Sequence, residues 1–156
     1  MNIREETKQM KLASPLLAAT AMEKRNEALA CIREALNAHK EEIFEANRKD
    51  LALARENHVA PAVVKRLTFN EAKLSDVTAE LTSLISLPDP IGKVTLDREL
   101  DEGLRLTRVT CPIGVIGVIF EARPDALVQI SSLCLKSGNC SILKGGKETT
   151  YTNRIL

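Results

Sequence analysis

The spacing of apolar residues divides the chain into two unlike parts. Over residues 1–90, apolar side chains recur every three or four positions, which is the period of one face of an α-helix. After residue 90, two short segments alternate apolar and polar residues and a continuous apolar run follows, and both patterns are typical of strands. The pattern predicts an α/β protein with a helical segment at residues 1–90, a β-hairpin linker at 91–110 and an α/β segment at 111–156.

Helix signals are strong in residues 1–90. Capping boxes, in which a Thr hydroxyl and a Glu carboxylate satisfy free backbone N–H groups, predict helix starts at residues 20–23 and 68–71. Pro61 suits the first turn of a short helix over residues 61–67. The prolines within residues 87–90 are expected to end the last helix, because proline lacks the N–H that a helix needs. The faces expected to be buried are Ala28, Leu29, Ile32, Ala35 and Leu36, then Ile43, Phe44, Asn47, Leu51 and Ala54, then Leu74, Val77, Leu81, Leu84 and Ile85.

The linker at residues 91–110 has the pattern of a β-hairpin. Residues 94–96 and 104–109 alternate apolar and polar side chains, as half-buried strands do. Gly103 lies in the turn at residues 101–103, where a positive φ is favoured. A two-stranded ribbon is marginally stable by itself, so we expect this hairpin to pack on another surface.

Residues 111–156 predict the opening of a parallel sheet. The run at 113–120 is apolar throughout, which is typical of a strand buried on both faces. Pro124 is placed to begin a helix with an apolar stripe, and Gly138 suits the end of that helix. A second strand is predicted at 140–144, then a turn at 145–148 and a helix from Thr149. This order is the βαβα opening of a doubly wound, Rossmann-like sheet.

The candidate binding residues lie where these strands end. In open α/β sheets, ligands bind beyond the carboxyl ends of the strands, which here are residues 121–125 and 144–148. The second segment combines two lysines with two glycines that allow close backbone approach, and it leads into a helix N-terminus that favours anions. Phosphate or adenosine-ribose binding is therefore predicted for Lys144, Gly145, Gly146, Lys147 and Glu148. In the alternative, this is a solvated basic turn whose glycines serve its geometry alone, and for Gly114 and Gly117 close backbone packing is favoured.

Composition excludes several classes of protein. The 156 residues carry 22 Lys and Arg against 21 Asp and Glu, and a net charge of +1 supplies no field to hold nucleic acid or an anionic membrane. No apolar run approaches the roughly 20 residues of a membrane helix, and the charged N-terminus has no apolar secretory region. We therefore expect a cytoplasmic protein. The four cysteines form no Cys-x-x-Cys pair and the two histidines have no ligand spacing, so neither a metal site nor a disulfide is expected.

The sequence around the predicted strand ends resembles a known enzyme family. The strings CPIGVIGVIFEARPD at 111–125, CLKSGN at 134–139 and ILKGGKE at 142–148 closely resemble gamma-glutamyl phosphate reductases, of the aldehyde dehydrogenase superfamily. Supporting matches lie upstream in the same order, at residues 24–29, 46–51, 66–67 and 87–92. The resemblance therefore covers nearly the whole chain.

This resemblance implies a reductase that converts L-glutamyl 5-phosphate to L-glutamate 5-semialdehyde with NADPH and releases phosphate, a step of proline biosynthesis. It implies thiolate attack on the acyl phosphate, followed by hydride transfer to the thioester. The family's cysteine lies downstream of the matched region, so we expect no catalytic residue in this chain and no turnover by it alone. The resemblance assigns NADP(H) to residues 144–148 and the substrate to Glu121 and Arg123.

Some alternatives stay open. For Arg123, the alternative to an anion contact is a salt bridge with Glu121 or Asp125 that fixes the loop. The same loop has no Asn of the kind that holds the oxyanion in many aldehyde dehydrogenases, so no such role is carried over.

Three functions are compatible with these observations. The first is the N-terminal part of the reductase, which forms a homo-oligomer when full length. The second is a short interaction module that pairs with a full-length reductase, and the third is an unrelated dinucleotide-binding module. Two strands make an incomplete sheet and the last residues have an uncapped helical pattern, so we favour the first and expect exposed apolar surface.

Overall fold

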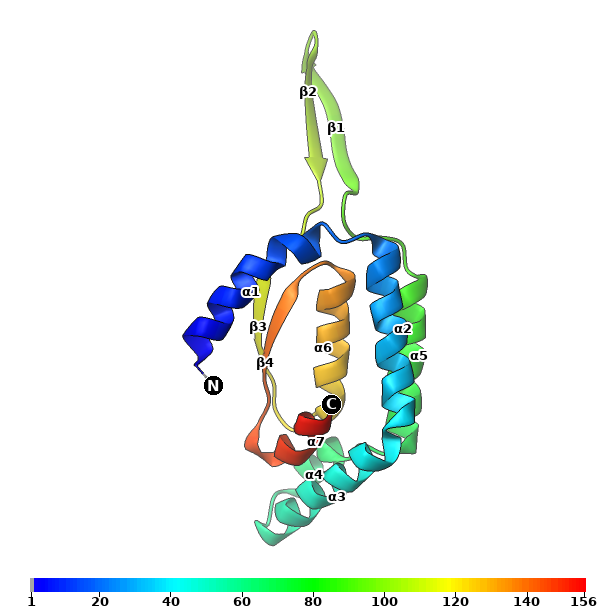
Figure 1. Ribbon diagram of the computed structural model, residues 1–156, viewed down its shortest axis with the longest axis vertical. Helices are drawn as coiled ribbons and strands as arrows, with labels where there is room; N and C mark the ends of the chain where they lie inside the picture. Colours follow the sequence, from blue (N-terminus) through cyan, green and yellow to red (C-terminus); the bar gives the residue numbers. More distant parts are fainter. Residues whose placement is uncertain (1) are drawn as a thin grey trace.

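The computed structural model describes residues 2–156 and has the predicted order of a helical segment, a hairpin and a parallel strand–helix–strand unit (Figure 1). Its first helix, over residues 3–18, was not predicted. In this part of the chain, five helices come first, then a β-hairpin, then a parallel strand–helix–strand unit and a short helix. The helices are α1 (Ile3–Ala18), α2 (Met22–Ala38), α3 (Lys40–Glu56), α4 (Pro61–Leu67), α5 (Glu71–Ser86), α6 (Pro124–Lys136) and α7 (Thr150–Ile155), with a 3-10 turn η1 (Lys147–Thr149). The strands are β1 (Val94–Asp101), β2 (Leu104–Val109), β3 (Val115–Ile119) and β4 (Cys140–Lys144).

The first predicted capping box is wrong. Helix α2 begins at Met22 with Ala21 as its N-cap, and no side chain caps it. Thr20 instead closes the preceding helix, because its hydroxyl donates to the Leu16 carbonyl at 2.9 Å. The reason is that α1 runs on to Ala18, so Thr20 is still within reach of the last carbonyls of α1.

The second capping box is also wrong in its details. Asn70 is the N-cap of α5, and its Oδ1 accepts the Lys73 N–H at 3.1 Å. The Thr68 hydroxyl donates to the Val64 carbonyl of α4 at 3.1 Å and is therefore not available. The short α4 ends so close to α5 that the two helices compete for the polar residues between them.

Helix α6 joins the N-terminal helices to the strands. It contacts β4, and it also contacts α2 and α5, while α1 contacts both strands (Figure 1). The larger of two clusters of buried apolar side chains is made of Leu29, Leu36, Ile43, Phe69, Leu74, Val77, Leu81 and Val128. Since Val128 belongs to α6, the helices of residues 1–90 and the strand–helix–strand unit share a core. Each such side chain contributes roughly 1.5–3 kcal/mol when it is fully buried.

The hairpin is formed as predicted but is not half-buried. Strands β1 and β2 pair antiparallel from Val94↔Val109 to Asp101↔Leu104, and Gly103 has a φ of +73° in the turn. The ribbon projects from the rest of the molecule (Figure 1), and Leu104 is 57% exposed. The expected packing partner is not among residues 2–156, because the segments on either side of the hairpin direct it away from the helices.

Strands β3 and β4 pair in parallel, in register from Val115↔Cys140 to Ile119↔Lys144. The expectation that the first strand is buried on both faces is wrong for this chain, since Ile119 is 77% exposed. Among the described residues, β3 has β4 as its one strand partner, so its other edge has no strand beside it. A doubly wound sheet therefore stays a prediction, while the parallel β3–α6–β4 unit is confirmed.

Candidate functional site

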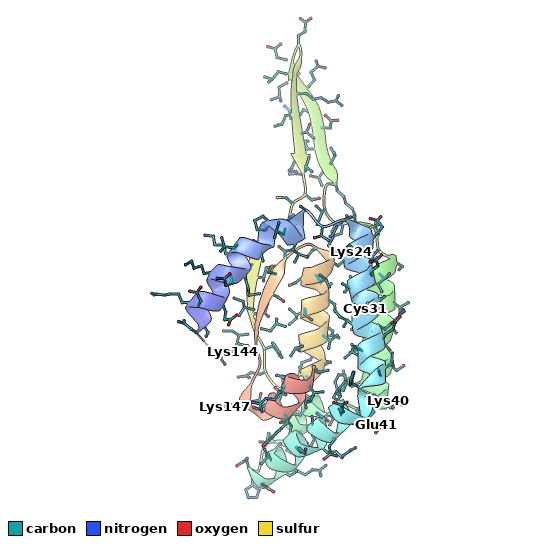
Figure 2. All side chains as sticks on the ribbon, viewed as in Figure 1. Lys24, Cys31, Lys40, Glu41, Lys144 and Lys147 are labelled. Atoms are coloured by element: carbon teal, nitrogen blue, oxygen red, sulfur yellow. The ribbon has the colours of Figure 1, made fainter. Side chains whose placement is uncertain are left out.

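The carboxyl ends of β3 and β4 bring the predicted site residues to one edge. Ile119 and Lys144 are paired, and the Phe120 N–H donates to the Lys144 carbonyl at 3.0 Å. The loops that follow, residues 120–123 and 145–146, therefore leave the sheet side by side. Lys144 and Lys147 lie at this end of the molecule (Figure 2), and both side chains are exposed.

Glu148 ties the two loops together. Its Oε1 accepts the backbone N–H of Ala122 at 2.9 Å. Ala122 has a φ of +50°, a left-handed conformation that costs a residue with a Cβ roughly 1–2 kcal/mol. It is 3% exposed and packs in a small apolar cluster with Ala54 and Leu67. The loop after β3 is thus held in an uncommon backbone conformation by a carboxylate from the loop after β4.

Asp125 fixes the other end of the same loop. Its buried carboxylate accepts from the Lys73 ammonium at 3.0 Å and from the Arg123 guanidinium at 3.2 Å. Burial by itself would raise the pKa of Asp125, but the hydrogen bonds from Lys73 and Arg123 hold this pKa below its ordinary value. The loop-fixing salt bridge to Asp125 is therefore confirmed as a role of Arg123. Substrate binding by Glu121 and Arg123, both exposed, stays a prediction.

Replacing Asp125 with Asn should lower the free energy of unfolding by about 2 kcal/mol near neutral pH, because Lys73 and Arg123 then lose their anion. The folded pKa of Asp125 is lowered, so its contribution is complete above about pH 4 and is lost as pH falls through the folded pKa. The difference between wild type and variant should therefore shrink in acid. Urea denaturation near neutral pH and in acid measures this difference in the free energy of unfolding. The control is Asp76→Asn, at an exposed position of α5. A difference that grows in acid contradicts the assignment.

The glycines of the turn at 145–148 are required by its own packing. A Cβ on Gly145 would collide with the Asn153 side chain, and one on Gly146 would collide with the Glu148 carboxylate. These contacts support the geometric explanation of the two glycines, while phosphate or ribose binding stays a prediction. For Gly117 the expected close packing is wrong within the described residues, because its Cβ position is open. It lies on β3 beside the uncovered edge.

The helix N-terminus expected to attract an external anion already holds an internal one. Asp50 of α3 accepts the backbone N–H groups of Tyr151 at 3.0 Å and Thr152 at 2.8 Å. Its Oδ2 also accepts the Thr152 hydroxyl at 2.6 Å. The start of α7 is therefore not free to bind phosphate, and any anion at this edge would have to use Lys144, Lys147 or the turn. The predicted site missed Asp50, although the string at residues 46–51 contains it.

A buried polar network fastens α2 and α6 to the base of the hairpin. Arg25 is 2% exposed, and its guanidinium donates to the Asp89 carboxylate at 2.6 Å, to the Thr20 carbonyl at 3.1 Å and to the Lys136 carbonyl. Partial burial raises the pKa of Asp89, but the Ile91 N–H and Arg25 together hold this pKa below its ordinary value. Arg25 thus links three segments that are distant in sequence.

Lys136 and Asn139 explain the string at residues 134–139. The buried Lys136 ammonium donates to the Leu87 carbonyl and to the Asn26 side chain, both at 2.8 Å. Burial lowers the pKa of Lys136, while the nearby Asp89 carboxylate partly raises it. The Asn139 side-chain oxygen accepts the backbone N–H groups of Ile113 and Gly114 at 2.7 and 2.9 Å. Asn139 thus holds the segment that leads into β3, and Lys136 joins α6 to α2 and to the end of α5, so both residues of the string have structural roles.

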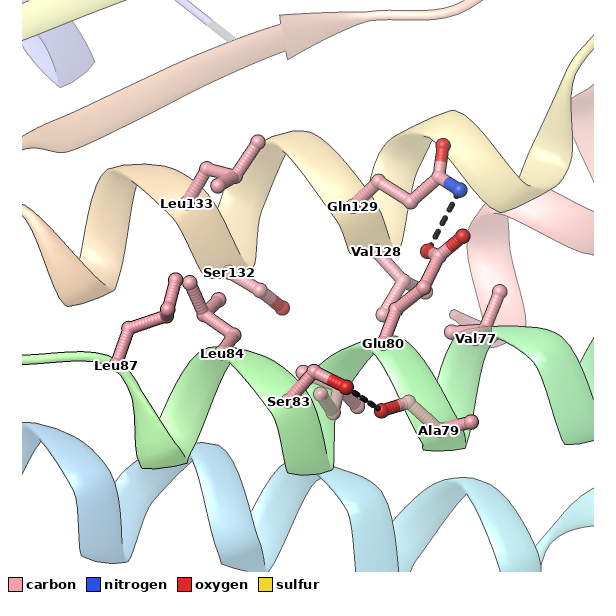
Figure 3. A pocket seen from close by; sticks show the side chains of 11 residues that line it. Val77, Ala79, Glu80, Ser83, Leu84, Leu87, Val128, Gln129, Ser132 and Leu133 are labelled. Carbon is pink, nitrogen blue, oxygen red and sulfur yellow. Dashed lines mark hydrogen bonds between the residues drawn. The ribbon is translucent and has the colours of Figure 1, made fainter.

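An apolar groove of about 510 Å³ lies between α5 and α6 (Figure 3). A hydrogen bond of 2.7 Å from Gln129 to Glu80 crosses it, and of the described residues that line it Glu80 alone is charged. The buried Ser132 hydroxyl has no partner among the described residues. Leu133 of α6, which also lines the groove, is 58% exposed. The groove is separate from the loops that follow the strands.

The cysteines lie away from the edge that carries the lysines. Cys31 is exposed on α2 (Figure 2), Cys111 precedes β3 and Cys140 begins β4. Burial raises the pKa of the Cys134 thiol, which disfavours its thiolate. The absence of a catalytic residue stays a prediction. Residues 2–156 place no three His, Cys, Asp or Glu side chains together as a metal site, and none of the helices described is long and apolar enough to cross a membrane.

Comparison with known proteins relates this geometry to one family. No protein-family profile matches the chain. Over 156 residues, the chain is 56% identical to a gamma-glutamyl phosphate reductase from Acetivibrio thermocellus and spans 36% of its length. The crystal structure of gamma-glutamyl phosphate reductase from Saccharomyces cerevisiae superposes with a TM-score of 0.94 at 41% identity, covering 99% of this chain and 39% of that one.

A more distant structure shows the fold alone. The probable aldehyde dehydrogenase from Listeria monocytogenes has a TM-score of 0.68 at 13% identity and matches 96% of this chain and 30% of that one. The chain spans somewhat more than a third of the length of the curated relatives. The chain is therefore a homologue of gamma-glutamyl phosphate reductases, matching their N-terminal part, and it has an aldehyde dehydrogenase-like fold.

Proposed function

We propose that this chain supplies ligand-facing loops of an oxidoreductase that reduces L-glutamyl 5-phosphate to L-glutamate 5-semialdehyde with NADPH and releases phosphate, in proline biosynthesis. The relatives named gamma-glutamyl phosphate reductase support the activity. The observation that carries the proposal is the bridge from Glu148 to Ala122. It holds two loops together at the carboxyl ends of parallel strands, where such sheets bind ligands.

The two loops are proposed to divide the ligands between them. Lys144 and the backbone of the turn at 145–148 would hold phosphate or ribose groups of NADP(H), because an exposed cation beside accessible backbone suits an anion. Arg123 would contact the acyl phosphate with the half-exposed guanidinium that its bond to Asp125 orients. Glu121 would face the substrate's cationic amino group. When bound, NADPH supplies the hydride, and the nucleophilic cysteine is proposed to lie outside residues 2–156.

Replacing Lys144 with Met should weaken NADP⁺ binding about tenfold, because one favourable ion contact is lost. Isothermal titration of the purified 156-residue chain measures the affinity. Lys24→Met is the matched control, since the Lys24 side chain is 76% exposed on α2 and its partner is Glu27. Equal affinities of wild type and Lys144→Met would remove Lys144 from the site. Oxidation of NADPH by the chain when glutamyl phosphate is added would disprove the proposed lack of turnover.

The projecting hairpin favours a second candidate function. Its exposed side chains include Leu100, Leu104 and Leu106, which a partner surface could cover. A short module that pairs with a full-length reductase would use such a ribbon. Size-exclusion chromatography of the chain mixed with a full-length relative tests this, and elution at separate positions contradicts it. A chain that binds NADP⁺ but forms no such complex would favour the first candidate.

Three broader expectations remain proposals. The division into a helical segment at 1–90, a hairpin linker at 91–110 and the start of an NADP-binding domain at 111–156 is one of them. A homo-oligomer of the full-length enzyme and a cytoplasmic location are the other two. All three follow from the proposed reductase function. Size-exclusion chromatography of the full-length enzyme tests the homo-oligomer.

A further inference from the structure

We infer that Glu148 is a positioning residue that sets the backbone of the Arg123 loop, and that its carboxylate makes no contact with the cofactor. This inference rests on the proposed function, because it concerns how the loop presents Arg123 to an anionic substrate. It differs from the expectation that Glu148 binds NADP(H).

The first argument is the conformation of Ala122. A residue with a Cβ at a φ of +50° needs compensation from its surroundings. The Glu148 carboxylate provides a charge-assisted hydrogen bond to the Ala122 N–H at 2.9 Å. Burial of the Ala122 methyl group beside Ala54 and Leu67 adds a second restraint. Without the carboxylate, the left-handed conformation loses its polar anchor.

The second argument is the position of the carboxylate itself. Both of its oxygens lie directly over the backbone of Gly146, where a Cβ would collide with them. The Glu148 side chain is thus folded back between the two loops and is half-buried. A carboxylate in this position is already engaged by the protein, whereas a ribose contact would require it to extend from the edge.

The third argument is the effect on Arg123. Its backbone follows Ala122 directly, and its side chain is tied to Asp125, which Lys73 holds in turn. The position of the Arg123 guanidinium is therefore set by two hydrogen bonds. Asp125 holds the side chain, and Glu148 holds the backbone through the Ala122 N–H.

The direction of the expected change in anion affinity distinguishes this role from a simple charge effect. Removing an anion near an anion site ordinarily strengthens binding by electrostatics, but removing this anchor should weaken it.

The test uses Glu148→Ala and the double variant Glu148→Ala with Ala122→Gly in the 156-residue chain. Glycine adopts the left-handed conformation without steric cost, so it should rescue the loop only if Glu148 acts through Ala122. The probes are inorganic phosphate and NADP⁺, each titrated separately. Hydrogen exchange of the Ala122 and Arg123 amides is measured by NMR. Glu148→Gln, which keeps an acceptor oxygen, replaces Glu148→Ala if the latter does not fold, with smaller effects in the same direction.

We expect Glu148→Ala to weaken phosphate binding about tenfold and to accelerate exchange of the Ala122 amide by about the same factor, as loss of a charged hydrogen bond implies. NADP⁺ affinity should stay within about twofold, and the double variant should recover most of the phosphate affinity, while the amide of residue 122 stays in fast exchange because glycine supplies no acceptor for it. Weaker NADP⁺ binding with unchanged amide exchange, or stronger phosphate binding, would overturn the inference. If the wild-type chain binds neither probe, the proposed function fails for this chain. Exchange of the Ala122 amide in Glu148→Ala then still decides whether Glu148 anchors the loop: exchange as slow as in wild type overturns the inference.

Discussion

Replacing Arg25 with Met is expected to lower the free energy of unfolding by about 4 kcal/mol, the size typical of breaking a buried ion pair from one side. The guanidinium is almost fully buried and serves Asp89 and the carbonyls of Thr20 and Lys136. Met fills a similar volume but leaves the two carbonyls without the Arg25 donor, while Asp89 keeps the Ile91 N–H. The loss is concentrated at the buried Lys136 carbonyl and the partly buried Thr20 carbonyl, because Asp89 is about a third exposed and can be hydrated.

Urea denaturation followed by circular dichroism measures this effect, and the midpoint should fall by about 2 M. Lys24→Met is the control on the neighbouring position, because Lys24 is exposed and its pair with Glu27 contributes little. Arg25→Lys separates charge from geometry. It keeps the cation, but its three donors sit on one nitrogen and cannot reach acceptors that are spread along the guanidinium fork, so it should recover less than half of the loss. A midpoint for Arg25→Met within about 0.5 M of wild type would show that the network is not stabilising.

Replacing Asp50 with Ala should cost about 3 kcal/mol, which corresponds to a fall in Tm of about 10 °C for a chain of this size. The substitution removes the acceptor of both the Thr152 N–H and the Thr152 hydroxyl proton, although Asn47 still donates to that hydroxyl at 3.2 Å. Thr152 is 0% exposed, so water cannot replace the lost acceptor. The Tyr151 N–H also loses its acceptor, at a more exposed position. Helix α7 would then lose its attachment to α3.

Thermal unfolding compared with Asp76→Ala, an exposed aspartate of α5, checks this second prediction. The control should change Tm by no more than about 2 °C. Asp50→Asn should be intermediate, because an amide keeps one acceptor oxygen but places an NH₂ against a backbone donor. If all three variants melt together with wild type, the start of α7 does not depend on Asp50.

The sequence predicted the elements whose signals are local. The bounds of α4 and β4 agree with the predicted residues 61–67 and 140–144, since Pro61 and the flanking glycines act on their immediate neighbours. The capping-box predictions failed because the hydroxyls of Thr20 and Thr68 lie between two helices. Each hydroxyl donates to a carbonyl of the preceding helix instead of capping the following one, and the sequence pattern does not distinguish the two. The burial of β3 failed because burial depends on what lies beside a strand.

The edge that carries the candidate site was predictable for a topological reason. Parallel strands end at the same edge, so Glu121, Arg123 and Lys144 had to come together once the βαβ unit was identified. The hydrogen bonds within that edge were not predictable. Glu148 bonds to a residue 26 positions away and Asp50 to one 102 positions away, and no sequence spacing encodes either pairing. In the sequence, Glu148 is interpreted as a cofactor ligand and Asp50 is given no role.

The distance along the chain between Arg25 and the Lys136 carbonyl has a consequence for synthesis on the ribosome. The two residues are 111 positions apart, so the arginine leaves the ribosome long before the carbonyl that it binds has been made. At about 5–20 residues per second, this interval is on the order of 5–20 s. During it, α2 and α3 have Leu29 and Ile43 without the α6 side chain that completes their cluster. The apolar faces of the nascent helices therefore stay incompletely covered until α6 has been made.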